Sequence, residues 1–302
     1  MNSIKKQGFI IFKKALALTM LIVFGGYICN AQSVKRVFDF TTGDEFEKQS
    51  VLKSTTNIQR GTQKLLVSSS STITKLYKVT ETIDTTAKLD ITIKKMDNVI
   101  SALGQLLHYD SEKGADTTSK IQKSLNSMLN TPVTVQINKT GKILSSDESA
   151  LKIINDSLLV FAGIQSETFT KGSQFTLTPK FNMSDRVKPG YVWMDTVTLD
   201  QQKMITRFWI DDISDGHTIV KFQSKLTSSY LNSNTTGTYV LDNRSGMIIQ
   251  RLVQSISNGY QVMNSLVYIT NRSISLSEEI TLRPVKGRRP TPIDPDMTVK
   301  AN

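Results

Sequence analysis

The chain has 302 residues, a formal net charge of +11, two histidines and a single cysteine, Cys29. A chain of this length holds one large domain or two ordinary ones. One cysteine excludes an internal disulfide and a zinc site built from several thiolates.

The first 31 residues have the order of a secretory signal peptide. Lys5–Lys14 hold four lysines and no acidic residue, Ala15–Phe24 is apolar, and small residues precede Gln32. The apolar run is about half of the ~20 residues that span a bilayer. We expect cleavage after Ala31 and export to the periplasm, cell surface or medium, with no transmembrane segment in the mature chain. A lipoprotein anchored at Cys29 and a retained membrane anchor are the alternatives.

Cleavage would change the chemistry available to the protein. Residues 1–31 carry four lysines and no acidic side chain, so their removal lowers the formal charge from +11 to +7. It also removes Cys29, which excludes thiol nucleophiles from the mature chain. The remaining positive charge is compatible with anionic envelope polymers or lipid headgroups, and also with general solubility.

Residues 32–282 have the pattern of a β-rich domain. In Ala87–Lys95, apolar and polar residues alternate, which predicts a strand of an antiparallel sheet with one buried face. Ser and Thr are expected mainly at the outward positions. Similar patterns predict strands at Ile73–Ile83, Val133–Ile137, Phe175–Phe181, Tyr191–Leu199, Ile205–Ile210, Thr218–Ser229, Thr238–Asp242, Met247–Ile256 and Val262–Leu276.

Turns and helices interrupt these strands. Asn138–Gly141 and Asp242–Gly246 each begin with an Asx residue and end with a glycine, which predicts two hairpin turns. Thr117–Leu129 and Glu148–Ala162 have the apolar spacing of helices. Met96–Tyr109 fits either a helix or a bent continuation of the sheet.

The predicted fold is mainly β (α+β): a curved antiparallel sheet or half-barrel with two helices packed on it. Gly43–Phe46 and Pro189–Trp193 open strands at comparable places. We interpret this as two related halves, 32–145 and 163–282, joined by the helix within 146–162, although any β protein reuses such turns. Residues 283–302 are rich in Pro and basic residues, which predicts a disordered tail.

Few residues offer chemistry. His108 and His217 have no second His, Cys or Glu at metal-ligand spacing. Asp211, Asp212, Asp215 and His217 suit a cation or a base with its orienting carboxylate, and equally an ordinary hairpin turn. No nucleophile elbow, phosphate loop or EF-hand loop occurs. We therefore predict no catalytic residue, no metal site, no cofactor and no nucleic-acid partner.

Five short motifs lie between residues 36 and 280: Ile91–Met96, Tyr109–Ser111, Pro132–Val135, Asn138–Ile143 and Val187–Trp193. Together they resemble an exported, β-rich, weakly duplicated family of unknown function that is common in Bacteroidota. The resemblance implies no active-site residue, because this family has no established one. The chain departs from the pattern at Tyr191, where an acidic residue often follows the glycine.

The predicted function is that of a non-catalytic envelope protein that binds an apolar or amphipathic ligand such as a lipid. It rests on fold-level analogy with exported lipid and lipoprotein carriers. The candidate ligand-lining residues are Tyr191, Trp193, Trp209 and Phe222, which simply fill a dry core in the alternative interpretation. Two other functions stay open: a surface or periplasmic interaction module that binds protein or glycan, and a hydrolase.

Overall fold

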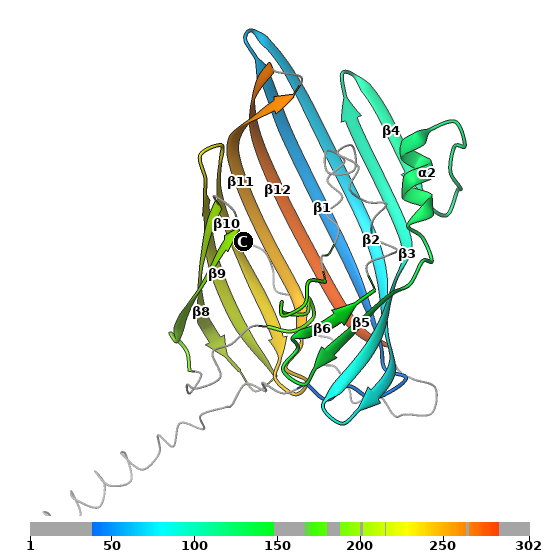
Figure 1. The fold of residues 1–302 in the computed structure, drawn as a ribbon, viewed down its shortest axis with the longest axis vertical. Coiled ribbons are helices and arrows are strands. Elements are labelled where there is room, and N and C mark those ends of the chain that lie inside the picture. The colour runs from blue at the N-terminus through cyan, green and yellow to red at the C-terminus, as the bar shows by residue number, and fades with distance from the viewer. Residues whose placement is uncertain are drawn as a thin grey trace, which may run out of the picture. The chain divides into compact units, whose positions relative to one another are not determined.

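The structure, a computed structural model, describes residues 38–147, 167, 169–179, 188–199, 202–214, 216–263 and 266–283. These residues form one antiparallel sheet of 12 strands and one α-helix (Figure 1). The predicted mainly β fold with a large antiparallel sheet is therefore confirmed. The elements are β1 (Glu45–Arg60), β2 (Gln63–Ile83), β3 (Thr86–Ala102), β4 (Gln105–Asp110), α2 (Lys120–Ser127), β5 (Val133–Asn138), β6 (Ile143–Ser146), β7 (Val192–Leu199), β8 (Gln202–Ile213), β9 (His217–Thr227), β10 (Leu231–Asp242), β11 (Ile248–Met263) and β12 (Leu266–Arg283).

The first and last strands are neighbours in the middle of the sheet. The strand order is β6-β5-β3-β2-β1-β12-β11-β10-β9-β8-β7, and β4 pairs with the half of β3 that β5 leaves free. Here the upper end of the sheet is the one with the β1–β2 turn, and the lower end is the one with Glu45 and Arg283. Because β1 is central and β7 lies at an edge, the proposed relation between two halves stays a prediction.

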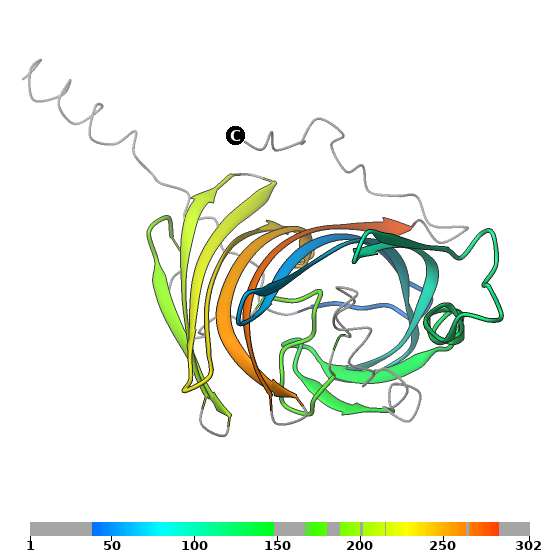
Figure 2. The same cartoon turned by 90° about the horizontal axis from the view of Figure 1, so that it is seen from above.

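The lower half of the sheet curls around a hydrophobic core. Val79, Leu89 and Val135 point to one face of neighbouring strands and are fully buried. Figure 2 shows β5 and β6 opposite β1 and β12 across this core. The loop 169–179 adds Phe175 and Leu177, which are also fully buried. We call the face of the sheet toward this loop the inner face, and the opposite face the outer face.

Local sequence signals predicted the turns correctly. Asn138–Gly141 joins β5 to β6 and Asp242–Gly246 joins β10 to β11, and each glycine has a positive φ, +76° and +74° respectively. The ambiguous stretch Met96–Tyr109 belongs to the sheet, because β3 continues to Ala102 and turns through Gly104 into β4.

Two of the predicted strands are wrong. The described part of Phe175–Phe181 forms turns, because its phenylalanine and leucine enter the core from a loop. The Phe175 amide donates to the Gly141 carbonyl at 2.8 Å and the Ile248 amide donates to the Leu177 carbonyl at 2.9 Å, but the described residues of this stretch form no strand. The stretch Val262–Leu276 is not one strand, since β11 extends to Met263 and β12 begins at Leu266 and runs antiparallel to it. β11 continues past its predicted end at Ile256, because polar residues and a glycine at 257–259 interrupt its apolar pattern, and β12 continues past Leu276 to Arg283 at the lower end of the sheet.

The helix predicted at Thr117–Leu129 is confirmed in a shorter form, α2. Ser119 caps it, since its Oγ accepts a hydrogen bond from the Gln122 amide at 3.3 Å. Leu125 is fully buried against β3 and β4. The second predicted helix, Glu148–Ala162, lies outside the described residues, as do the predicted signal peptide and residues 284–302 of the predicted tail. Among the described residues, no helix is long and apolar enough to cross a membrane.

Candidate functional site

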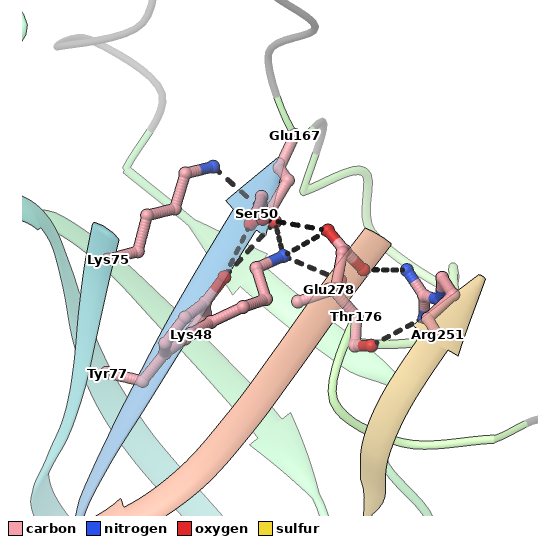
Figure 3. Close-up of polar contacts among 8 residues, drawn as sticks. All are labelled: Lys48, Ser50, Lys75, Tyr77, Glu167, Thr176, Arg251 and Glu278. Atoms are coloured by element: carbon pink, nitrogen blue, oxygen red, sulfur yellow. Dashed lines mark hydrogen bonds and ion pairs between the residues drawn. The ribbon is translucent and has the colours of Figure 1, made fainter. Parts of the chain in front are cut away.

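Five charged side chains meet on the inner face beneath the loop 169–179 (Figure 3). Lys48 comes from β1, Lys75 from β2, Arg251 from β11 and Glu278 from β12, while Glu167 precedes the loop. The strand register places Lys48 opposite Lys75 and Glu278 opposite Arg251. Because directly opposed side chains lie close enough to interact, the sheet alone brings four of the five together. We call these five residues the inner charge cluster.

Lys48 occupies the centre of the inner charge cluster and its side chain is only 1% exposed. Its Nζ contacts the Glu167 carboxylate and lies 3.2 Å from Glu278 Oε1. On the other side of Glu278, Arg251 Nη1 donates to Oε2 at 2.9 Å. Arg251 Nη2 donates to the Thr176 carbonyl at 2.9 Å, which connects the sheet to the loop.

Both carboxylates receive further donors. The Tyr77 hydroxyl donates to Glu167 Oε2 at 2.9 Å, and Lys75 Nζ lies 3.4 Å from Glu167 Oε1. The Ser50 hydroxyl donates to Glu278 Oε1 at 3.1 Å. Multiple charge-assisted contacts of this kind compensate a carboxylate for the water that it loses on burial.

The cations decide the protonation states of this cluster. Burial acts to raise the pKa of Glu167, but Lys48 and Lys75 outweigh it and hold that pKa well below its usual range. The pKa of Glu278 is lowered by the same balance, through Lys48 and the arginine. Burial and the charge of Glu167 raise the pKa of Tyr77 well above its ordinary value. At neutral pH both carboxylates are therefore ionised and Tyr77 is protonated.

The inner charge cluster is suited to holding chain segments together. Two carboxylates are paired with three cations, and residues from four strands and one loop contribute. Removal of one member of a buried ion network leaves an uncompensated charge, which is costly. We infer that the cluster fixes the loop 169–179 on the lower half of the inner face.

A row of aromatic rings continues along the inner face toward β7. Tyr191 stacks on Trp193 with ring centroids 5.6 Å apart, and Trp193 stacks on Phe208 at 5.1 Å. Phe208 lies 5.8 Å from Phe222, which lies 4.9 Å from Tyr239. The row ends at the inner charge cluster, where the arginine lies 5.1 Å above the Tyr239 ring.

Three of the four predicted ligand-lining residues, Tyr191, Trp193 and Phe222, belong to this row. The fourth, Trp209, lies on the outer face, because it follows Phe208 directly on β8 and successive side chains of a strand point to opposite faces. Sequence analysis missed Phe208 and Tyr239. The alternation within β8 was a usable signal for separating Phe208 from Trp209.

Trp209 instead lines a groove of about 580 Å³ on the outer face. Lys221, Thr238 and Leu252 line it from β9, β10 and β11, and Phe222 and Gly237 also border it. This volume lies within the range of small-molecule sites. We call this feature the outer groove.

The upper half of the inner face carries hydroxyl groups rather than charges. Ser54 and Thr56 on β1 and Ser69 and Ser71 on β2 are all buried. The Ser69 and Ser71 hydroxyls have no hydrogen-bond partner among the described residues. These four residues are exceptions to the expectation that Ser and Thr lie mainly at outward positions. We call these four residues the inner hydroxyl surface.

Apolar and cationic side chains border the inner hydroxyl surface. Leu52, Ile58 and Val67 flank its hydroxyl residues on the same face and are buried as well. Arg272 on β12 donates from Nε to Ser54 Oγ at 3.1 Å, and burial lowers the pKa of Arg272. The lining is therefore mixed, with aliphatic groups, hydroxyls and one guanidinium.

The cluster around His217 has the contacts of a hairpin turn. His217 Nδ1 lies 3.0 Å from Ser214 Oγ, and Lys221 Nζ forms an ion pair with Asp211 Oδ2 at 2.9 Å. His108 lies 3.0 Å from Asp97 at the surface. Within the described residues no group of three or more His, Cys, Asp or Glu side chains is placed to hold a metal ion.

Comparison with known proteins supports the predicted resemblance over part of the chain. Residues 84–158 match the model of the Family of unknown function (DUF6263). They include β3, β4, α2, β5 and β6. No curated protein matches the chain in sequence.

Among solved structures, similar chains share little sequence with this one. Lipovitellin, from a structure on its lipid–protein interactions, is 12% identical, with a TM-score of 0.48; the match covers 83% of this chain and 27% of lipovitellin. The OccK5 (OpdH) protein of Pseudomonas aeruginosa is 7% identical, with a TM-score of 0.23 and coverages of 79% and 98%. The translocator domain of the autotransporter NalP from Neisseria meningitidis is 8% identical, with a TM-score of 0.22 and coverages of 90% and 97%. This chain thus spans about a quarter of lipovitellin, and similarities at this level carry no functional argument.

Proposed function

We propose that the protein is an exported, non-catalytic binding protein that holds an amphipathic ligand against the inner hydroxyl surface. The observation that carries this proposal is the pair of buried hydroxyls, Ser69 and Ser71, that lack a hydrogen-bond partner among the described residues. A buried polar group without a partner costs about 1–3 kcal/mol. A polar group of a ligand would offset that cost, as would an ordered water.

The surroundings of these hydroxyls favour a ligand with both polar and apolar parts. Leu52 and Val67 provide aliphatic contact beside Ser69 and Ser71, and Arg272 lies on the neighbouring strand β12. An acyl chain matches the aliphatic side chains, and a hydroxyl or an acidic head group matches the hydroxyls and the guanidinium. Lipids of the cell envelope have this combination.

The inner charge cluster supports the non-catalytic part of the proposal. General acid–base catalysis is most efficient with a pKa near the working pH. Glu167 and Glu278 are instead held ionised and Tyr77 protonated at neutral pH. Their described contacts join the sheet to the loop.

Native mass spectrometry tests the proposal. The protein is produced from its full-length coding sequence, purified from the cell envelope, and its N-terminus is read by mass. We expect a discrete co-purifying mass that is lost on denaturation and recovered by lipid extraction. A clean mass that gains no adduct after incubation with extracted envelope lipids contradicts the proposal.

A matched pair of variants localises the ligand. Ser69→Ala with Ser71→Ala is expected to lower the ligand-bound fraction, with an affinity loss of about tenfold for two lost hydrogen bonds. Ser68→Ala with Ser70→Ala changes the outer face of the same strand and is expected to leave the bound fraction unchanged. Equal losses in both variants would place the ligand elsewhere.

The outer groove supports a second candidate function, recognition of a glycan or a protein segment. Trp209 provides an aromatic surface, and Lys221, Gln223 and Gln254 surround it with hydrogen-bonding groups. Tryptophan fluorescence during titration with envelope glycans tests this function. A response that Trp209→Ala abolishes and Trp193→Phe retains would assign binding to the outer groove.

A further inference from the structure

Two hairpin turns, which connect β1 to β2 and β3 to β4, lie at the upper end of the sheet, where β11 ends and β12 begins (Figure 1). The register confirms their proximity, because Gln59 of β1 lies opposite Ile269 of β12, and Val67 of β2 lies opposite Ala102 of β3. We call these turns and the outer face beside them the upper rim.

The upper rim exposes large apolar side chains. Leu103, in the β3–β4 turn, is 80% exposed, and Leu106 and Leu66 are 71% and 61% exposed. Tyr260 and Ile269 lie directly opposite each other on β11 and β12. Exposed apolar side chains that are concentrated at one end of a protein indicate an interaction site. The exposed apolar residues of the upper rim are Leu66, Leu103, Leu106, Ile256, Tyr260, Val267 and Ile269.

The outward direction of this surface follows from strand alternation. On β2 the odd-numbered residues Val67 and Ser69 are buried on the inner face, so Leu66 points outward. On β12 the even-numbered Glu278 and Ile280 are buried, so Ile269 points outward. These apolar side chains therefore lie apart from the inner hydroxyl surface, and their exposure is a separate observation.

The charge of the upper rim has one sign. Arg60 and Lys64 are exposed in and beside the β1–β2 turn. The sequence contains no Asp or Glu from residue 48 to 80, from 98 to 109, or from 243 to 277. These three stretches supply the whole upper rim. At the lower end, by contrast, Glu45, Glu47 and Glu81 lie on β1 and β2.

We propose that the upper rim docks on the surface of an anionic lipid membrane. Aliphatic and tyrosine side chains at the tips of hairpins enter the boundary between lipid head groups and acyl chains, and basic side chains beside them attract anionic head groups. Charge complementarity favours this partner over a second copy of the chain. In a contact between two upper rims, Arg60 and Lys64 would face cations with no acidic residue of the rim to pair with them.

The proposal goes beyond ligand binding and does not depend on it. A membrane surface at the upper rim would lie beside the upper half of the inner face, where the amphipathic ligand is proposed. The rim would then bring the protein to the lipid phase from which such a ligand is taken or to which it is delivered. Docking and ligand binding are nevertheless measured separately, since one uses the outer face and the other the inner face.

Vesicle sedimentation tests the docking. The purified protein, with its N-terminus verified by mass, is mixed with vesicles of phosphatidylglycerol and phosphatidylethanolamine and with vesicles of phosphatidylcholine alone. We expect binding to the anionic vesicles that weakens as salt is added, because counterions screen the attraction. No sedimentation of the wild-type protein with anionic vesicles overturns the proposal.

Two double variants of the upper rim are compared with two double variants of the lower end to identify the surface that contacts the vesicles. Arg60→Gln with Lys64→Gln is expected to weaken binding by about tenfold or more, and Leu103→Asn with Leu106→Ser by a similar factor. Asn is chosen at 103 because it tolerates the positive φ of +53° there. The lower-end controls Lys88→Gln with Lys139→Gln and Ile83→Ser with Leu282→Ser also change exposed side chains and are expected to bind normally.

The outcomes separate membrane docking from its rivals. Losses confined to the upper-rim variants, with unchanged circular dichroism and thermal midpoints, support the proposal. Equal losses in the lower-end controls overturn it, as does a concentration-dependent dimer in analytical ultracentrifugation that the leucine variant abolishes without any vesicle binding. If Ser69→Ala with Ser71→Ala loses its ligand but still sediments with vesicles, ligand binding and docking are distinguished.

Discussion

The lower and upper halves of the inner face treat buried polar groups in opposite ways. In the lower half, Glu167 and Glu278 each contact two cations and a hydroxyl. In the upper half, the Ser69 and Ser71 hydroxyls are buried without a partner among the described residues. The same strands, β1 and β2, supply both halves. The difference indicates that the chain itself satisfies the two carboxylates of the lower half, where only Arg251 Nε lacks a partner among the described residues of the inner charge cluster. The two serine hydroxyls of the upper half could instead accept or donate a hydrogen bond to another molecule.

The largest expected effect comes from removing the central cation of the lower half. Lys48→Met keeps the length of the side chain but leaves Glu167 and Glu278 close together without the charge between them. We expect a loss of about 3–5 kcal/mol in the free energy of unfolding, measured by urea denaturation. Lys53→Met, on the exposed outer face of β1, is the matched control and should change stability by less than about 0.5 kcal/mol. Similar losses for both lysines would contradict the role assigned to the cluster.

Acidic pH should reduce the stability that the inner charge cluster contributes in the lower half of the inner face. The pKa values of Glu167 and Glu278 are lowered in the folded protein, so both bind protons more readily when it is unfolded. Their contribution is present above the ordinary glutamate pKa of about 4.3 and is lost as pH falls through the folded values. We expect unfolding free energy to fall by more than about 1.4 kcal/mol between pH 6 and pH 3, the equivalent of one pKa unit.

A variant identifies the groups responsible for that acid sensitivity. Glu278→Gln removes one of the two carboxylates, so its unfolding free energy should vary less steeply over the same pH range. Glu279→Gln, the neighbouring and exposed position on β12, should retain the wild-type slope. A steep slope that survives in Glu278→Gln would assign the acid sensitivity to other carboxylates.

A substitution that crowds the aromatic row is expected to have an intermediate effect on stability. A Cβ added at Gly237 would lie 2.4 Å from a carbon of the Phe222 ring and 2.6 Å from the Leu252 carbonyl oxygen. The ring can move, but the backbone oxygen belongs to the neighbouring strand. We therefore expect Gly237→Ala to destabilise the protein by about 1–3 kcal/mol in thermal or urea unfolding. Recovery of stability in Gly237→Ala with Phe222→Leu would identify the ring as the main obstacle, and no loss in the single variant would contradict the close packing.

The accuracy of sequence-based prediction follows from how local each feature is. The turns Asn138–Gly141 and Asp242–Gly246 were predicted because the residues that fix them are adjacent in sequence. The inner charge cluster was not, because Lys48 and Glu278 meet only when the first and last strands pair. One signal was available: Lys48 lies in phase with the buried Phe46 and Leu52, so the alternation places a lysine on the inner face.

The candidate ligand-lining residues show the same limit. Tyr191 and Trp193 are two residues apart, so their shared face could be predicted from the strand period. Their contact with Phe208 requires the β7–β8 register, whereas alternation within β8 is enough to place Trp209 on the face opposite Phe208. The inner hydroxyl surface was missed for another reason. Ser and Thr are polar enough to be assigned to the outside, yet small enough to be buried on the inner face of the sheet.

The smallest expected effect on unfolding free energy comes from removing single buried hydroxyls. The comparison is between a hydroxyl that has a hydrogen-bond partner and one that has none among the described residues. Ser224 and Ser71 are both buried serines on the inner face, but Ser224 accepts a hydrogen bond from the Thr206 hydroxyl at 2.9 Å. Ser224→Ala breaks a buried pair and should lower the unfolding free energy by about 1 kcal/mol. In ligand-free protein, Ser71→Ala removes an unsatisfied group and should leave the unfolding free energy unchanged or raise it by about 1 kcal/mol. If Ser71→Ala destabilises the ligand-free protein as much as Ser224→Ala does, the Ser71 hydroxyl already has a partner within the chain or an ordered water, and the upper half of the inner face has no unmet hydrogen bond to offer a ligand.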